Sequence, residues 1–167
     1  MQRTEATCVA DGLLSPLRVG AVRLGISADS VRLLCPVARE TDIKEYFARV
    51  LVVPIASESL FVWTTHGVVE RIEVTSPRFR TVDSLGVGSP LARLQRLTGM
   101  DAGVGDGSDV VMIYTSSGNA CGLSFRVDEA TAETLSHQRD VRAATLAYRG
   151  DGHIIEVGVL GRIRCAP

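Results

Sequence analysis

The chain has 167 residues, a formal net charge of −1 and 46% hydrophobic residues. This length is sufficient for one domain with a buried core. The balanced charge argues against a nucleic-acid partner, which usually requires a clustered basic surface. No apolar run approaches the roughly 18 to 20 residues that cross a bilayer, so no transmembrane segment is predicted.

The amino terminus and the cysteines bear on the compartment. The first ten residues lack the apolar core of a signal peptide, which leaves a cytoplasmic protein or a mature fragment expressed without its export signal. The spacing of Cys8, Cys35, Cys121 and Cys165 excludes the usual zinc-ribbon and thioredoxin-like motifs. Of three disulfide pairings, Cys8–Cys35 with Cys121–Cys165 keeps each bridge within one of the repeats described next. Isolated buried thiols are the alternative, and the residues alone leave both open.

Two segments share the order of apolar strand, glycine, helix cap and short helix. Residues 22–36 align with residues 85–99 at an offset of 63 positions, which places Gly25 on Gly88. In the second segment Ser89 is expected to cap the free amides at the start of the helix. This match indicates an internal repeat.

A second pair of segments follows in the same order. Residues 60–67 align with residues 111–118 at an offset of 51, which places Trp63 on Tyr114. Each predicts two β segments joined by a polar turn that ends in glycine. The change of offset predicts twelve extra residues between helix and hairpin in the first copy. Trp63 and Tyr114 are interpreted as equivalent core residues.

The chain is therefore predicted to be α+β, with two tandem helix-plus-β-hairpin repeats. These would form a mostly antiparallel sheet with short helices packed on one face. Residues 1–167 are predicted to form a single domain, with repeat 1 over about 17–81 and repeat 2 over about 82–165. Residues 130–140 are expected to form a loop or frayed helix, and residues 141–159 a terminal hairpin with an Asp-Gly turn.

The order of glycine, capped short helix, break and apolar hairpin, present twice, resembles the tandem repeats of beta-lactamase inhibitory protein and the related small outer-membrane assembly lipoproteins. The resemblance covers residues 20 to 127. The junction from residue 72 to residue 90 also resembles bacterial extracytoplasmic proteins of this architecture. These families pair a helical hairpin with an antiparallel sheet, and several members bind proteins. The lipoproteins carry an apolar signal that ends in a lipidated cysteine, and no such run precedes Cys8.

Few residues indicate chemistry. The three histidines, His66, His137 and His153, are far apart and none belongs to a metal-binding pattern, so we interpret them as exposed turn residues. Gly86-Val-Gly88 lacks the Gly-Lys-Ser/Thr of a phosphate loop. We assign no catalytic residue, no cofactor and no metal ligand.

Two acidic motifs are interpreted in the same way. Asp101, Asp106 and Asp109 lie in a glycine-rich loop, but their spacing is not that of an EF-hand, so a solvated loop is preferred to a calcium site. The tripeptide from Arg149 to Asp151, which integrins recognise, is attributed to the chemistry of a turn.

Arg78 and Arg80 alternate along one predicted strand and are the candidate interaction face, and a solvent-facing strand edge protected by charge explains them equally well. The leading hypothesis is a bacterial, periplasmic or secreted, non-enzymatic protein that binds or assembles another protein through a sheet face or edge. The alternative is a small cytoplasmic enzyme or ligand-binding protein whose site is assembled from distant residues. A structural subunit of a homo-oligomer is a third possibility, and the oligomeric state is not predicted.

Overall fold

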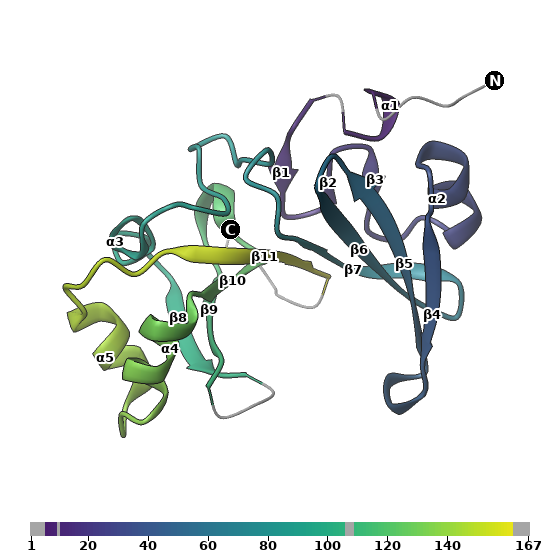
Figure 1. Cartoon of the computed structure of the whole chain (residues 1–167). Coiled ribbons are helices and arrows are strands. Elements are labelled where there is room, and N and C mark those ends of the chain that lie inside the picture. The colour runs from purple at the N-terminus through teal and green to yellow at the C-terminus, as the bar shows by residue number, and fades with distance from the viewer. Residues whose placement is uncertain (1–5, 10, 106–108, 162–167) are drawn as a thin grey trace.

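The computed structural model describes residues 6–9, 11–105 and 109–161. They form an eight-stranded sheet with strand order β4-β5-β6-β7-β11-β10-β9-β8 and a three-stranded sheet with order β1-β2-β3 (Figure 1). Neighbouring strands pair antiparallel in both sheets. The predicted α+β class with a mostly antiparallel sheet is confirmed.

The elements up to β7 make up what we call the first half. In chain order they are α1 (Ala6–Val9), β1 (Leu14–Ser15), β2 (Arg18–Val19), β3 (Val22–Arg23), α2 (Ala28–Leu34), β4 (Arg39–Ile43), the 3-10 helix η1 (Lys44–Tyr46), β5 (Ala48–Ile55), β6 (Glu58–Thr65) and β7 (Val68–Val74).

The elements after β7 make up the second half. They are α3 (Leu91–Leu94), β8 (Met100–Val104), β9 (Val111–Thr115), the 3-10 helix η2 (Gly118–Ala120), β10 (Leu123–Val127), α4 (Glu129–Ser136), α5 (Val141–Ala147) and β11 (Ile154–Leu160). None of the described helices is long and apolar enough to cross a membrane.

The large sheet consists of two four-stranded meanders that meet at their last strands. β4 to β7 follow one another across the sheet from one edge, and β8 to β11 do so from the other edge. The meanders join where β7 pairs with β11, with Glu73 opposite Gly158. Each half therefore contributes a meander of four strands, rather than the single hairpin that the sequence predicts.

A glycine with a left-handed backbone precedes the helix of each half. Gly25 has φ 82° and donates its N–H to Val69 O over 2.8 Å. Gly88 has φ 84° and donates its N–H to Ile154 O over 2.7 Å. Val69 and Ile154 lie at the start of β7 and β11, so both glycines attach their helix to the last strand of the meander.

The strand order contradicts the predicted alignment of the hairpins. β6 is third in its meander and β9 is second, so Trp63 and Tyr114 do not occupy matching positions. β6 matches β10, and the pairing with the last strand shifts register between Trp63 and Thr64 and between Arg126 and Val127. These shifts lie 63 positions apart, as the two glycines do. Successive hairpins of a meander have the same local pattern, which allowed an alignment that is one strand out of step.

The halves differ in the connection to their last strand. A turn at His66 and Gly67 joins β6 to β7, whereas α4 and α5 lie between β10 and β11. The extra chain is thus in the second half, and not between helix and hairpin in the first. The predicted terminal hairpin is also wrong over its first strand, because Val141–Ala147 is helix α5. Asp140 begins this helix, since its carboxylate accepts the N–H of Ala143 over 2.9 Å.

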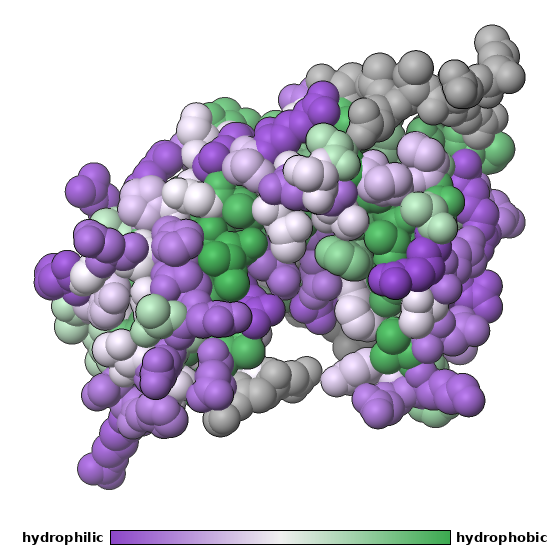
Figure 2. All heavy atoms as spheres, viewed as in Figure 1, coloured by the Kyte–Doolittle hydropathy of each residue, from purple (hydrophilic) through white to green (hydrophobic). Residues whose placement is uncertain are grey.

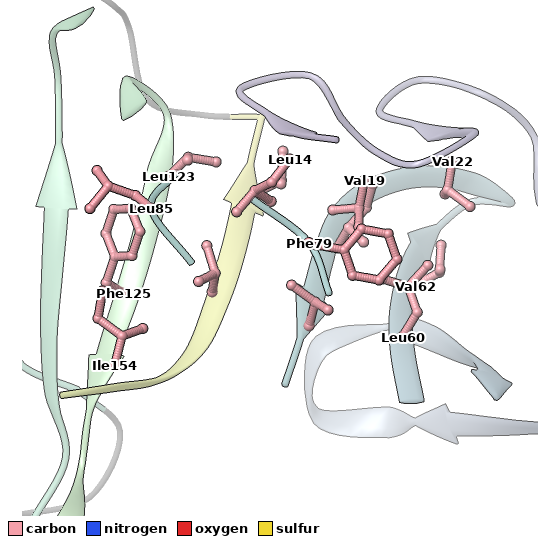
Figure 3. Close-up of a cluster of buried hydrophobic side chains, with 14 of the residues drawn as sticks. Leu14, Val19, Val22, Leu60, Val62, Phe79, Leu85, Leu123, Phe125 and Ile154 are labelled. Carbon is pink, nitrogen blue, oxygen red and sulfur yellow. The ribbon is translucent and has the colours of Figure 1, made fainter. Parts of the chain in front are cut away.

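The buried core lies on one face of the large sheet and draws on both halves. Figure 3 shows Phe79 and Leu85, from the segment that links the halves, among the buried side chains of the strands. The helices add to the same cluster, for example through Val31 of α2 and Leu135 of α4. Burial of this apolar surface is the main favourable contribution to folding, and it leaves the other face of the sheet without a helical layer among the described residues.

Candidate functional site

The three histidines are exposed and lie in separate connections. His66 is in the β6–β7 turn, His137 follows α4 and His153 precedes β11. His153 Nδ1 lies 3.4 Å from the carboxylate of Asp128, which also accepts the N–H of His153 and caps α4. Desolvation opposes ionisation of Asp128, but hydrogen bonds from the N–H groups of His153 and Thr131 outweigh it and lower the pKa. This pair joins α4 to β11, and the described residues contain no group of three potential metal ligands.

The cysteines agree in part with the predicted pairing. Cys8 and Cys35 form a disulfide that ties α1 to the end of α2. Cys121 is buried and is not a free thiol. Its predicted partner, Cys165, lies outside the described residues.

The remaining predicted residues do not gather into one site. Arg78 is exposed, whereas Arg80 donates to Pro77 O and to Ser89 Oγ and so holds the segment between the halves. Asp101 is exposed on β8, 3.9 Å from Arg142, and Asp109 is exposed beyond the β8 end. Asp106 lies outside the described residues. Arg149 donates to the carbonyls of Leu146 and Tyr148 at the end of α5. These local hydrogen bonds explain the position of its side chain without a binding partner.

A more promising surface is the face of the large sheet that points away from the core, which we call the open face. Its side chains alternate with the core-facing ones along β6 and β7, whereas on β9 and β10 the open-face positions Met112 and Ser124 are buried as well. Figure 2 shows the molecule hollowed between its two halves, below β7 and β11 in that view. The open-face residues that matter below are Phe61 and Trp63 of β6, Arg71 and Glu73 of β7, Met112 and Tyr114 of β9, Arg126 of β10 and Glu156 of β11.

Trp63 belongs to a polar cluster on this face, in which Arg71 Nε is the one buried donor without a hydrogen-bond partner among the described residues. Its Nε1 donates to Glu73 Oε2 over 2.9 Å, and Arg71 pairs with the same carboxylate. The Arg71 guanidinium also lies 5.5 Å from the centre of the Trp63 ring, within the range of a cation–π contact. Tyr46 packs edge-on against that ring at 6.4 Å. Trp63 and Tyr114 are thus half-buried residues of the open face, and the interpretation of both as core residues is wrong.

A cleft of about 460 Å³ lies beside this cluster, between β7, β9, β10 and β11. Glu156 points into it with a side chain that is only 20% exposed, and its one ion pair is to Arg126 at 3.8 Å. It accepts no hydrogen bond from the described residues. Desolvation and the neighbouring charge of Glu73 raise the pKa of Glu156, although Arg126 and Arg71 oppose the shift. The cleft therefore holds a carboxylate whose charge is poorly compensated.

A second hollow, a groove of about 840 Å³, lies in the first half between α2, the tip of the β4–β5 hairpin and the β6–β7 turn. Arg32 pairs there with Asp29 at 2.6 Å and with Glu40 at 2.7 Å, and Arg49 pairs with Asp42 at 2.7 Å. The corresponding region of the second half is the surface of β8 and β9. It carries apolar side chains in place of this charged network, and α4 and α5 cover it. The charged network suits a surface in contact with water, so we prefer the open face as the candidate site.

The fold is similar to that of known structures, although no protein-family model and no curated protein sequence matches the chain. The uncharacterized protein yfeY from Escherichia coli has a TM-score of 0.58 at 11% identity, over 87% of this chain and 97% of that one. A cysteine-rich secretory protein (SAV1118) from Staphylococcus aureus has a TM-score of 0.46 at 9% identity, over 83% of this chain and 44% of that one. At this identity the likeness to yfeY shows the fold alone.

Sequence reasoning missed the charged residues of the open face. Arg71 and Glu73 alternate with the buried Ile72 and Val74, a pattern that predicts a polar face for the strand. Glu156 is harder to find, because its cleft forms only when β11 inserts between β7 and β10.

Proposed function

We propose that this chain is a non-enzymatic bacterial protein that acts outside the cytoplasm and binds another protein through the open face of its sheet. The proposal unites the face itself, the disulfide and the resemblance to inhibitor and assembly-lipoprotein repeats. These three observations are independent of one another, and the open face is the strongest support for the proposal.

The main observation is the group of aromatic side chains at the open face and its rim. Phe61, Trp63 and Tyr114 are half-buried on the strands. Next to them, at the tip of the β4–β5 hairpin, Tyr46 packs against the Trp63 ring and is 56% exposed. Aromatic residues that combine an apolar body with a polar surrounding are enriched in protein interfaces.

The disulfide supports action outside the cytoplasm. Disulfides persist mainly in oxidising compartments, whereas cytosolic thiols are kept reduced. Cys8–Cys35 closes a chain segment of the first half, and such a bridge would be lost in a reducing cytoplasm. Alkaline phosphatase fused to the full gene is therefore expected to be active, and an inactive but intact fusion would contradict export.

The proposal includes an origin by duplication of one unit of helix and four-stranded meander. The offset of 63 positions holds for the glycines before α2 and α3 and for the register shifts in β6 and β10. The α4–α5 segment is then an insertion in the second copy. In the proposed resemblance to beta-lactamase inhibitory protein, the repeated unit would then be a helix with a four-stranded meander rather than a helix with a hairpin.

Site-specific photo-crosslinking tests the binding surface. Benzoylphenylalanine at Tyr46, beside Trp63, is expected to form one discrete adduct in cells of the species that encodes the chain. The matched control places the same group at Val82, which is 75% exposed in the segment between the halves. The adduct should disappear when Phe61→Arg is combined with the probe at Tyr46.

Three results would contradict this binding surface: no adduct at Tyr46, equal labelling at Val82, or an adduct that persists with Phe61→Arg. An adduct with twice the mass of the chain would identify a second copy as the partner, and would favour the homo-oligomer over an assembly role with another protein.

A further inference from the structure

The open face contains two carboxylates in one cleft, and they differ in how far hydrogen bonds and ion pairs compensate their charge. Glu73 is 12% exposed, accepts the Trp63 indole N–H and pairs with Arg71. Glu156 is similarly shielded, but its one ion pair among the described residues, with Arg126, has a length of 3.8 Å and includes no hydrogen bond. Because a shielded charge is costly unless it is paired and hydrogen-bonded, Glu156 is the uncompensated member of the pair.

The position of Glu156 in the sheet explains why it lacks a close partner. Val69 and Ile154 accept the N–H groups of Gly25 and Gly88 and so mark equivalent points on β7 and β11. Arg71 follows Val69 by two residues and Glu156 follows Ile154 by two residues, so the two side chains occupy equivalent positions. The carboxylate that serves Arg71 is Glu73, and the corresponding residue of β11 is Gly158. The second half therefore has no counterpart of the side chain that completes the cluster in the first half. A Cβ at Gly158 would lie 2.5 Å from Ser124 Oγ, so Ser124 fills that position, and the open space beside Glu156 is the cleft itself.

The walls of the cleft suit a long cationic side chain. Met112 and Tyr114 line it from β9, and Val110 lines it from the loop before that strand. Most of the lining is polar, and this apolar part on the β9 side can contact the methylene stem of a lysine or arginine while its charged end pairs with a counter-ion. Arg71 Nε is a buried donor of this cleft without a hydrogen-bond partner among the described residues, but its guanidinium already pairs with Glu73, so an anion would have to compete with that carboxylate.

We propose that this cleft receives the ammonium or guanidinium group of a lysine or arginine side chain of the partner protein, and that this group pairs with Glu156. The inference rests on the proposed function, because the open face must be a protein-binding surface. It adds the chemistry of the partner, which presents a basic side chain at the centre of the interface. A charge-assisted hydrogen bond would then replace the loose contact with Arg126.

Binding of a minimal probe tests the site. Nα-acetyl-arginine methylamide is titrated into the whole chain, and the indole N–H resonance of Trp63, the single tryptophan, is followed by NMR. The arginine probe is expected to shift this resonance saturably. The corresponding citrulline compound has the same shape without the charge, and it should bind at least tenfold more weakly.

Two variants locate the effect. Glu156→Gln keeps the size of the side chain and should weaken binding of the arginine probe at least fivefold. Glu133→Gln removes an exposed carboxylate of α4, changes the net charge equally and should bind the probe as the wild type does. Circular dichroism checks that both variants are folded. Equal affinity of Glu156→Gln and wild type, or of the arginine and citrulline probes, would overturn the cationic site.

The outcome can be separated from that of the proposed function. If the photo-adduct at Tyr46 persists undiminished in Glu156→Gln while the variant also retains the arginine probe, the open face binds a protein but the cationic site is wrong. If the probe binds through Glu156 and no adduct forms at Tyr46, the cationic site holds and the protein partner is wrong.

Discussion

At the scale of single residues, the open face shows how the position of a charge decides its effect. Glu73 and Glu156 lie on adjacent strands and face the same cleft. Glu73 has an arginine and an indole donor within reach, so its charge is compensated. Glu156 has neither in close contact, and desolvation is the largest influence on its pKa. The ionised form of Glu156 is therefore disfavoured by the fold.

Glu156→Gln should change stability in a pH-dependent way. The folded state raises the pKa of Glu156, so the stability linked to this group is complete below the unfolded-state pKa and is lost as pH rises through the folded-state pKa. At pH 7 the variant should be more stable than the wild type by less than about 1 kcal/mol. Near pH 4 the difference should shrink. Urea unfolding at both pH values measures it, and a variant that is less stable at pH 7 would contradict the assignment.

Ser89 makes hydrogen bonds close to the second helix, but they are not the ones that the sequence predicts. The sequence predicts that its hydroxyl caps the second helix. In the structure Pro90 occupies the cap position, and Ser89 Oγ accepts the N–H of Gly86 and a guanidinium N–H of Arg80. The hydroxyl thus stabilises the turn before the helix, because the arginine that reaches it comes from a segment whose path the local pattern does not reveal.

At the scale of elements, the glycine that precedes each helix is the feature that was best predicted. Gly25 and Gly88 have nearly identical backbone conformations and both donate to the start of the last strand of the meander. A left-handed residue at this point turns the chain into the helix, and glycine adopts it without strain. These glycines can be predicted from the sequence because the left-handed conformation is a requirement of the local backbone.

Alanine at these two glycines should be destabilising by similar amounts. A Cβ at Gly25 or Gly88 would meet no atom within 4 Å, so the cost is backbone strain alone, about 1 kcal/mol at each position. Gly103 is the matched control, since it also has open space around a Cβ but has no positive φ. Thermal unfolding compares the three variants. Equal stability of Gly103→Ala and either of the others would contradict the argument.

Strands and helices of the last third were harder to assign. Residues 141–148 contain apolar residues at intervals that fit either a strand or a short helix. Helix α5 forms because Asp140 caps it and because Gln95 donates from α3 to the carbonyls of Thr145 and Tyr148 at its other end. Gln95 lies 50 residues away from Thr145 along the chain, so no window of local sequence contains both groups.

At the scale of the whole molecule, one core joins the two halves and the disulfide secures the amino-terminal part. Leu14, Val19 and Val22 of the small sheet pack into the same cluster as Phe79 and the strands of the large sheet. Cys8 and Cys35 are both buried members of that cluster. The covalent bond therefore limits the freedom of the unfolded chain in a region where the elements themselves are short.

Replacement of both Cys8 and Cys35 by alanine should lower stability substantially. The bridge spans a sequence separation of 27, for which the loss of chain-closure entropy corresponds to about 3 to 4 kcal/mol. Urea unfolding of the double variant against the oxidised wild type measures the effect. Two substitutions of exposed residues, Thr41→Ala and Glu133→Ala, serve as the control. A loss below about 1 kcal/mol would show that the bridge does not constrain the unfolded chain.

Local patterns in the sequence are enough to predict the α+β class, the antiparallel sheet and the paired glycines, and they permit a bridge between Cys8 and Cys35 without selecting it. These features depend on alternation, backbone freedom and spacing, which are local properties. Only the tertiary structure decided that the halves are four-stranded meanders, that α4 and α5 lie between β10 and β11, and that Trp63 and Glu156 share the open face. The physical reason is that β11 pairs with β7 from the other half of the chain, and the cleft is created by that long-range pairing.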